Sequence, residues 1–298
     1  MNLYYFCRRI SLRYTYLCTI RSMASETDHI TRTSANKRGK VVAVAEIKKI
    51  ENLSPTVKRL HLYVENQDFS FKAGQWVDMF IPGVDKVGGF SMCSPPDFLI
   101  QERILHLAVK VSPHPPAHWV HTQCQAGDKV KLRVGGDFYY DPQPHTEDRD
   151  LLLIAGGVGI NPLFSMLQHF LFLHSDQVHA SRDNKVGRDQ NISLLYSAQS
   201  TDELIFQTEL IEKTQKFDNF LLKMFSTQGP VEDCKYASEG RIQLNDVQSA
   251  LSNLDKTKTT VYICGPQPFI DTMKSYCLDC DIPEDYVVFE KWSSPSSF

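Results

Sequence analysis

The chain has 298 residues, of which 42% are hydrophobic, and a formal net charge of −3. This length favours two domains over one, and the balanced charge gives no sign of a nucleic-acid partner. No apolar run in the sequence approaches the roughly 20 residues that are needed to span a bilayer.

The N-terminal segment is rich in arginine and free of acid. Arg8, Arg9, Arg13 and Arg21 all precede the first acidic residue, Glu26, and apolar side chains lie between them. This composition predicts a mitochondrial targeting sequence. The alternatives are a secretory signal and a disordered tail without a targeting role. Residues 25–40 are polar and are expected to form a linker.

From Val41 onward the apolar residues recur with a period of two. Leu60, Leu62 and Val64 would share one face of a strand, and the same alternation recurs at 77–81, 105–111 and 130–134. Short alternating strands separated by Gly, Pro and Asp predict an antiparallel β-barrel. Within this region a helix is expected only around 117–124.

A buried strand, a glycine turn and a helix follow at Leu151–Leu167, which reads LLLIAGGVGINPLFSML. Asn161 is expected to cap the helix, and Pro162 suits its first turn because the missing N–H there has no partner anyway. Glycines let the backbone approach a ligand, and the N–H groups at a helix start attract phosphate. The alternative is a tight turn that binds nothing.

The period of the apolar pattern changes after Asp150. Apolar strands are expected at 151–155, 192–197, 220–227, 260–264 and 286–289, and they alternate with helices at 162–174, 202–216, 244–254 and 268–280. This alternation predicts a doubly wound parallel α/β domain. Residues 175–191 are polar and are expected to form an exposed insertion loop.

The eight cysteines show no disulfide-framework spacing. Cys277 and Cys280 form a single C-x-x-C, which lacks the second pair or the histidines of a metal site, and we expect two reduced thiols on a helix. The sequence has no C-x4-C-x2-C run and therefore predicts no plant-type iron–sulfur cluster.

Six motifs between about 41 and 292 together resemble the ferredoxin–NADP reductase superfamily. In order they are Phe71–Val77 (F-x-x-G-Q), Gly88–Ser94 (R-x-Y-S-x-x-S with Gly88 at the arginine place), Gly127–Val130 with Gly135–Phe138, Gly156–Pro162 (G-G-x-G-x-x-P), Cys264–Pro268 (C-G-P-x-P) and Val288–Trp292. The resemblance implies an antiparallel flavin-binding β-barrel at 41–149 and a five-stranded parallel doubly wound NAD-binding domain at 150–298. A targeting segment and linker at 1–40 would precede them.

The resemblance also implies roles for single residues. Phe90 would lie along the flavin ring, and Ser91 would hydrogen-bond near its reactive nitrogen. Cys264 would lie beside the nicotinamide, so that Ser91 and Cys264 are the implied catalytic residues. The implied cofactor-binding set is Phe90, Ser91, Ser94, His118, Gly156, Gly157, Val158, Gly159, Ile160, Asn161, Pro162, Cys264, Gly265, Pro266 and Trp292, and no metal ligand is implied.

Two positions depart from the family pattern on the flavin-phosphate side. Gly88 stands where the family has an arginine that pairs with the pyrophosphate, and His118 stands where it often has a serine. His118 or Lys110 is a candidate replacement for the missing charge. If neither replaces it, Gly88→Arg is expected to tighten flavin binding, because a charge-assisted hydrogen bond contributes about 1.5–3 kcal/mol.

The sequence therefore predicts an enzyme that moves hydride from NAD(P)H to bound FAD, or alternatively FMN, and electrons on to a separate acceptor. NAD(H) is favoured over NADP(H), because after Tyr196 no basic residue appears until Lys213, whereas Asp202 or Glu203 suits a free ribose. A nucleotide-binding protein without turnover and a reductase subunit whose partner completes the flavin site are the alternatives.

Overall fold

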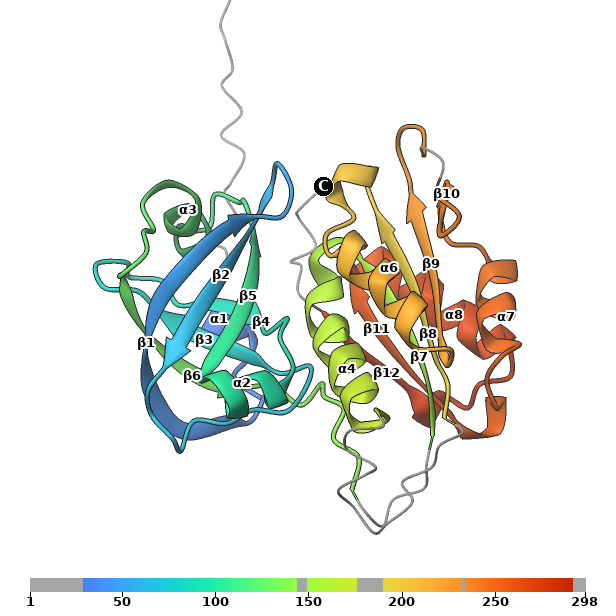
Figure 1. Ribbon diagram of the computed structural model, residues 1–298, viewed down its shortest axis with the longest axis horizontal. Coiled ribbons are helices and arrows are strands. Elements are labelled where there is room, and N and C mark those ends of the chain that lie inside the picture. Colours follow the sequence, from blue (N-terminus) through green and yellow to red (C-terminus); the bar gives the residue numbers. More distant parts are fainter. Residues whose placement is uncertain (1–28, 144–148, 176–189, 232–233, 292–298) are drawn as a thin grey trace, which may run out of the picture.

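The computed structural model describes residues 29–143, 149–175, 190–231 and 234–291. Within these ranges the chain forms two six-stranded sheets, which lie side by side in Figure 1. The predicted targeting segment and Trp292 lie outside the described residues. No helix among the described residues combines the length and the apolar character that crossing a membrane requires.

The first sheet is an antiparallel, nearly closed barrel with the strand order β4-β3-β6-β1-β2-β5. An isolated bridge between Met92 and Leu107 links the two edge strands β4 and β5. The strands are β1 (Arg38–Asn52), β2 (Val57–Val64), β3 (Trp76–Phe80), β4 (Gly88–Ser91), β5 (Ile104–Lys110) and β6 (Lys129–Gly135).

The alternating residues fill the barrel as the period of two predicts. Leu60, Leu62 and Val64 belong to one buried cluster together with residues of all the other strands except β4. The expected helix near 117–124 is α3 (Pro115–Thr122), and a second helix, α2 (Pro96–Glu102), was not expected. Because α2 spans only seven residues, it has too few turns to show a helical period.

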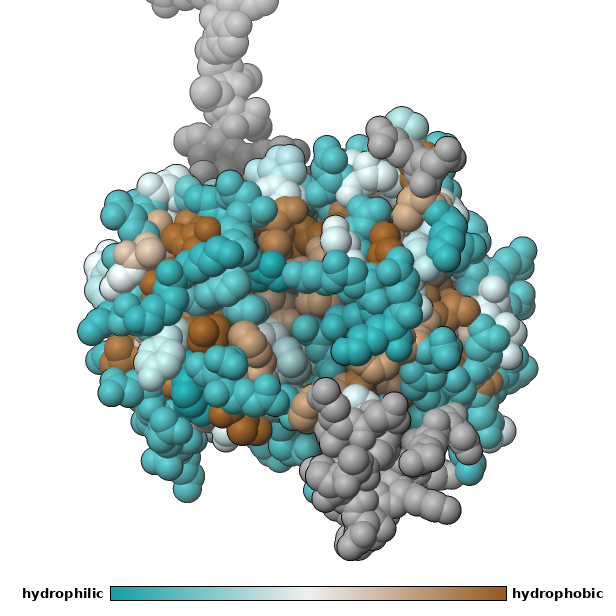
Figure 2. Space-filling view, in the orientation of Figure 1, coloured by the Kyte–Doolittle hydropathy of each residue, from teal (hydrophilic) through white to brown (hydrophobic). Residues whose placement is uncertain are grey.

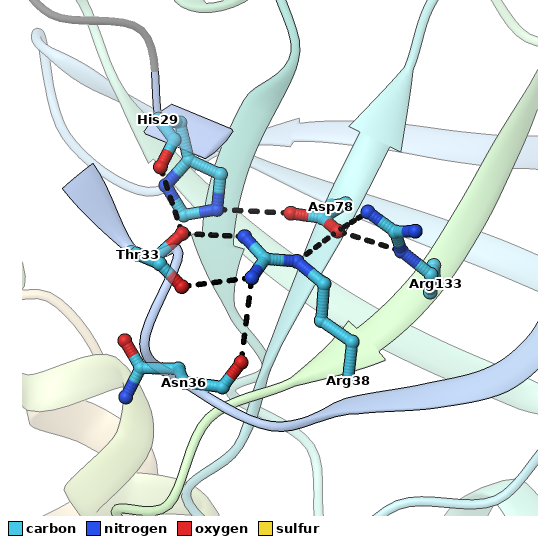
Figure 3. Close-up of polar contacts among 6 residues, drawn as sticks. All are labelled: His29, Thr33, Asn36, Arg38, Asp78 and Arg133. Carbon is cyan, nitrogen blue, oxygen red and sulfur yellow. Dashed lines mark hydrogen bonds and ion pairs between the residues drawn. The ribbon is translucent and has the colours of Figure 1, made fainter. Parts of the chain in front are cut away.

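The chain preceding β1 packs on the barrel from His29 onward, so the expectation of a polar linker at 25–40 is wrong for this part. Helix α1 (His29–Arg32) lies against β3, where His29 Nε2 is 3.1 Å from Asp78 Oδ1. Arg38 and Arg133 both donate to Asp78 Oδ2, at 2.9 Å and at 2.7–2.9 Å respectively (Figure 3). Polar residues here are buried because they neutralise one another.

The pKa of Asp78 shows how strongly its partners act. Burial by itself raises the pKa of this carboxyl, but the hydrogen bonds from His29, Arg38 and Arg133 outweigh burial and lower it to about 2. Asp78 therefore stays ionised while its side chain is 0% exposed.

The second sheet is wholly parallel, with the strand order β10-β9-β8-β7-β11-β12. It contains the five expected strands and a sixth, β10, whose three residues are too few for a pattern to reveal. The strands are β7 (Asp150–Gly156), β8 (Ile192–Ala198), β9 (Phe220–Ser226), β10 (Ala237–Glu239), β11 (Thr259–Gly265) and β12 (Val287–Lys291). The proposed division at 149/150 falls between the two sheets.

The expected helices of this domain are present within a few residues of their predicted ends. They are α4 (Ile160–Leu173), α6 (Gln207–Lys216), α7 (Leu244–Leu251) and α8 (Gln267–Asp279). The polar residues 202–206 precede α6 as the short 3₁₀ turn η2 (Thr201–Glu203) and a loop, instead of extending the helix. Figure 1 shows α4 between the barrel and the parallel sheet.

Candidate functional site

The glycine turn leaves the buried strand β7 at the centre of the parallel sheet. Gly157–Gly159 form one 3₁₀ turn, η1, and Gly157 has a φ of +56°, a conformation that side-chain-bearing residues rarely adopt. Helix α4 then begins at Ile160 with Gly159 at the capping position. The expectation that Asn161 caps this helix is therefore wrong, because Asn161 already lies inside the first turn.

The turn meets strand β11 at the point where the strand order of the sheet reverses. Ala155 on β7 pairs with Cys264 on β11, so the two predicted motifs lie side by side. A Cβ atom at Gly159 would lie 2.3 Å from the Cys264 carbonyl oxygen, which only glycine avoids. In doubly wound folds ligands bind at such a reversal, outside the carboxyl ends of the strands.

Cys264 is fully buried beneath this turn. Burial raises the pKa of its thiol well above the ordinary value, and the nearby Glu290 raises it further. The thiol is therefore neutral at physiological pH and offers a soft, weakly polar surface to its surroundings. Gly265 follows it as the last residue of β11, and Pro266 occupies the capping position of α8.

A stripe of polar side chains on α4 ties the glycine turn to the barrel. Asn161 Nδ2 donates to the Ala108 carbonyl (2.8 Å), and Ser165 Oγ donates to the Ser94 carbonyl (2.7 Å). One turn further on, Gln168 Nε2 donates to the Cys93 carbonyl (2.9 Å). These residues recur at helical spacing and so face the same way. They hold the first half of α4 against β5 and against the segment that follows β4.

The same contacts bring the implied flavin strand to the glycine turn. Ser91 is the last residue of β4. The next residue, Met92, forms a β-bridge with Leu107 on β5. Ala108, which follows Leu107, accepts the hydrogen bond from Asn161. The two groups of predicted residues, from β4 and from the turn, thus meet at one junction between the barrel and the parallel sheet.

The implied flavin residues differ in how available their side chains are. Phe90 is half-buried, and the structure gives the Ser91 hydroxyl no hydrogen bond among the described residues. Ser94 is buried, and its hydroxyl accepts from the His106 backbone N–H at 2.9 Å. Ser94 therefore holds the barrel backbone, whereas Phe90 is partly exposed at the end of β4 and the Ser91 hydroxyl is buried but unpaired among the described residues.

Neither candidate cation gives the phosphate side of the site a fixed positive charge. Gly88 is buried, and a Cβ there would lie 2.4 Å from the Phe90 ring and 2.9 Å from Pro116 Cβ. His118 is exposed on α3, with Nδ1 3.3 Å from Thr122 Oγ1. The other candidate cation, Lys110, contacts Glu203 at 3.4 Å. Because Pro115 and Pro116 open α3, its first two positions also offer no N–H to a phosphate.

The residues present fit a nicotinamide dinucleotide better than they fit a whole FAD. The turn leaves open space where a Cβ of Gly157 would point, and Asn161, two residues beyond the turn, has its Oδ1 buried without a hydrogen-bond partner among the described residues. For flavin, the residues that would contact the ring, Phe90 and Ser91, are present. The residues that would hold its phosphates, His118 and Lys110, offer only a weak anchor. We conclude that the site can hold a dinucleotide and the ring of a flavin.

Sequence reasoning missed two parts of this junction. Phe269, in the first turn of α8, packs over both Gly156 and Gly265, whose Cβ positions lie 3.1 and 2.8 Å from its ring. The stripe formed by Ser165 and Gln168 was also missed. The sequence did contain a signal for this stripe, since Asn161, Ser165 and Gln168 are polar residues at i, i+4 and i+7 of a largely apolar helix.

The remaining predicted residues lie at the glycine turn or elsewhere in the α/β domain. Val158 lies within η1, while Ile160 and Pro162 are buried in the first turn of α4. Cys277 lies on α8 and Cys280 at its end, and both are buried free thiols, as expected. Among the acids after β8, Glu203 accepts from Thr56 Oγ1 at 2.6 Å, whereas Asp202 is exposed.

Comparison with known proteins places this geometry in a family. Residues 153–275 match the family described as the oxidoreductase NAD-binding domain. Oxidoreductase NAD-binding domain-containing protein 1 of Xenopus laevis is 44% identical over 276 residues, which cover 91% of this chain and 86% of the relative.

Two solved structures share the whole fold at low sequence identity. The cytochrome P450 reductase GcoB of Amycolatopsis aligns with a TM-score of 0.69 and 19% identity, covering 84% of this chain and 69% of that one. A ferredoxin NADP+ reductase from Neisseria gonorrhoeae with bound FAD and NADP aligns with a TM-score of 0.64 and 18% identity, covering 84% and 98%. The predicted barrel followed by a parallel α/β domain is thus confirmed.

Proposed function

Because this chain belongs to the family of oxidoreductase NAD-binding domain-containing protein 1, within the ferredoxin–NADP reductase superfamily, we propose that it is a flavin-dependent oxidoreductase. It takes hydride from NADH and delivers electrons to a separate acceptor. The observation that carries this proposal is the junction where the glycine turn, Cys264 and the end of β4 meet.

Each group at the junction has a stated task in this proposal. The turn at Gly157 and Gly159 admits the dinucleotide backbone, and Asn161 Oδ1 accepts a hydrogen bond from it. Cys264 packs beside the nicotinamide ring, and Phe90 and Ser91 hold the flavin ring by stacking and by a hydrogen bond. When bound, flavin accepts two electrons as hydride and can release them one at a time.

The preferences for NAD(H) over NADP(H) and for FAD over FMN are finer parts of the proposal. After β8 the chain offers the exposed Asp202 and no basic residue until Lys213, which suits a free 2′-hydroxyl. The Neisseria reductase with the same fold carries FAD, which supports FAD over FMN here. We also propose that residues 1–25 direct the chain to mitochondria, which a fusion of residues 1–40 to a fluorescent reporter tests directly.

The test uses the purified full-length chain under anaerobic conditions. FAD and FMN are titrated separately, and NADH or NADPH is then added while the flavin absorption bands are followed. We expect FAD to bind and NADH to bleach it faster than NADPH does. Gly157→Val is the control, since it should bind flavin but resist bleaching.

A second function has its own observation in support. The buried Gly88 and the two prolines that open α3 leave the flavin phosphates without a strong anchor. A chain that binds NADH yet binds neither flavin at any concentration would be a nucleotide-binding protein or a subunit whose partner completes the site. That outcome would remove the oxidoreductase proposal for this chain alone.

A further inference from the structure

A cavity lies between the barrel and the α/β domain, on the side lined by α4 and α6. Its volume is about 530 Å³, which is within the range of small-molecule sites. Arg59 and His106 line it from β2 and β5, Phe164 and Phe172 from α4, and Glu209 and Lys213 from α6. In Figure 1 these elements face one another across the junction of the domains.

This cavity is separate from the candidate dinucleotide site. Neither the glycine turn nor Cys264, Phe90 or Ser91 lines it. The part of α4 that does line it begins at Phe164 and runs toward the other end of the helix. Figure 2 shows hydrophilic side chains over most of this face, with hydrophobic ones among them near the junction.

Two buried polar atoms of the cavity lining lack partners among the described residues. They are His106 Nε2 and Glu209 Oε2, and neither makes a hydrogen bond. Buried polar groups in native proteins nearly always have a partner, and leaving one unpaired costs about 1–3 kcal/mol. Two such atoms beside one cavity therefore indicate a polar ligand. Lys213 adds a partly exposed cation, which Glu209 and Glu212 attract and which makes no hydrogen bond with any described residue.

The charges around the cavity define which ligand group each atom can take. Arg59 is already paired, since it donates to Glu51 Oε2 at 2.8 Å and to Glu209 Oε1 at 2.7 Å. Lys213 is thus the inner cation left for an anionic group, while Glu212 and Lys216 are exposed at the rim. The second oxygen of Glu209 can accept only from an N–H or O–H donor.

The neutral side chains of the cavity add one donor and an apolar wall. Burial, together with the charges of His61 and Arg59, lowers the pKa of His106 to about 3, so its imidazole is neutral and can donate through Nε2. Phe164 is stacked on Phe206 with the ring centroids 4.4 Å apart, and this stack fixes one wall. Apolar and aromatic ligand groups pack well against such walls.

We propose that this cavity binds a small α-amino or α-hydroxy carboxylate with an aromatic side chain. Lys213 and His106 take the carboxylate, Glu209 Oε2 takes the amino or hydroxyl donor, and the ring of the ligand packs against Phe164 and Phe172. Because the cavity is lined by both domains, its ligand adds contacts between the barrel and the α/β domain.

Four probes that share a phenyl group test this proposal by calorimetric titration of the full-length protein. L-phenylalanine and L-phenyllactate carry both required groups, 3-phenylpropionate lacks the donor, and phenethylamine lacks the carboxylate. We expect at least one of the first two to bind at least about tenfold tighter than both of the others, which corresponds to about 1.4 kcal/mol.

Variants locate the binding in this cavity. Lys213→Met should weaken probe binding at least about tenfold, because it removes the cation that takes the carboxylate. Glu209→Gln should remove the preference for probes with a donor. Lys216→Met at the rim is the matched control and should bind the probes within about threefold of the parent chain.

Three outcomes would overturn the proposal. The first is that none of the probes binds the parent chain. The second is that Lys213→Met binds them as the parent chain does. The third is that NADH displaces them competitively, which would place them in the dinucleotide site.

Discussion

The side-chain amide of Asn161 donates to the Ala108 carbonyl across 2.8 Å, from the first turn of α4 to the barrel strand β5. Its other amide atom, Oδ1, is buried and makes no hydrogen bond within the part of the chain that the structure describes. Asn161 thus helps to join the two domains, and its second amide atom is an unpaired acceptor two residues beyond the glycine turn.

Asn161→Ala should affect both stability and binding. The Ala108 carbonyl would stay buried without its donor, which costs about 1–3 kcal/mol. NADH affinity, measured by fluorescence titration, should fall at least about tenfold. Ser165→Ala is the control, since it removes a hydrogen bond one turn further along the same stripe. If both variants lose NADH affinity equally, Asn161 acts only by holding the domains.

Gly157→Val tests whether the glycine turn binds a dinucleotide. A side chain at Gly157 meets nothing within 4 Å, so it would extend into the space proposed for the ligand, and NADH binding should be lost. Gly83→Val controls for backbone strain, because Gly83 has a φ of +78° and an equally open Cβ position. Unchanged NADH affinity in a folded Gly157→Val protein would show that the turn is only structural.

The structure reverses the expectation for Gly88→Arg. An arginine at this buried position would displace the Phe90 ring and press on Pro116, so flavin affinity should fall instead of rising. His118→Arg places the same charge on the exposed face of α3 and should tighten flavin binding by about tenfold. Titration of both variants with FAD decides between them, and a gain at Gly88 would refute the steric argument.

Asp78→Asn should destabilise the barrel in a pH-dependent way. Because the folded-state pKa of Asp78 is lowered to about 2, its contribution is complete above about pH 4 and is lost as the pH falls toward 2. The lowering corresponds to about 2 kcal/mol, and the variant also removes the carboxylate that neutralises Arg38 and Arg133. Urea denaturation should show a large difference from the parent chain at pH 7 and a smaller one at pH 3. A difference that does not change with pH would contradict this assignment.

The sequence predicted the elements whose pattern repeats over several residues. Two patterns predict their structure without ambiguity, namely the alternation at Leu60, Leu62 and Val64 and the apolar run of β7. Each indicates a strand because these side chains are buried in a regular geometry. Two short elements were missed, the three-residue strand β10 and the seven-residue helix α2, because neither contains enough of its own repeat to be recognised.

The candidate site was predictable where glycine is required by the backbone and unpredictable where side chains meet across the chain. Gly159 must lack a side chain because Cys264 lies against it, and the motif shows this. The bond from Asn161 to Ala108 joins residues 53 positions apart, and local reasoning instead assigned Asn161 to a helix cap. Phe90 filling the space beside Gly88 likewise depends on packing that only the fold reveals.

The contacts of His29 with Asp78 and of Arg38 with the same carboxylate also limit how far the N-terminus can be shortened. A truncation that ends before residue 29 leaves the whole cluster intact, whereas one that removes Arg38 strips two of the three cationic or hydrogen-bonding groups from a buried carboxylate. Such a product would expose Trp76 and the outer surface of β3. The barrel itself therefore requires that a fully stable shortened chain begin at or before His29.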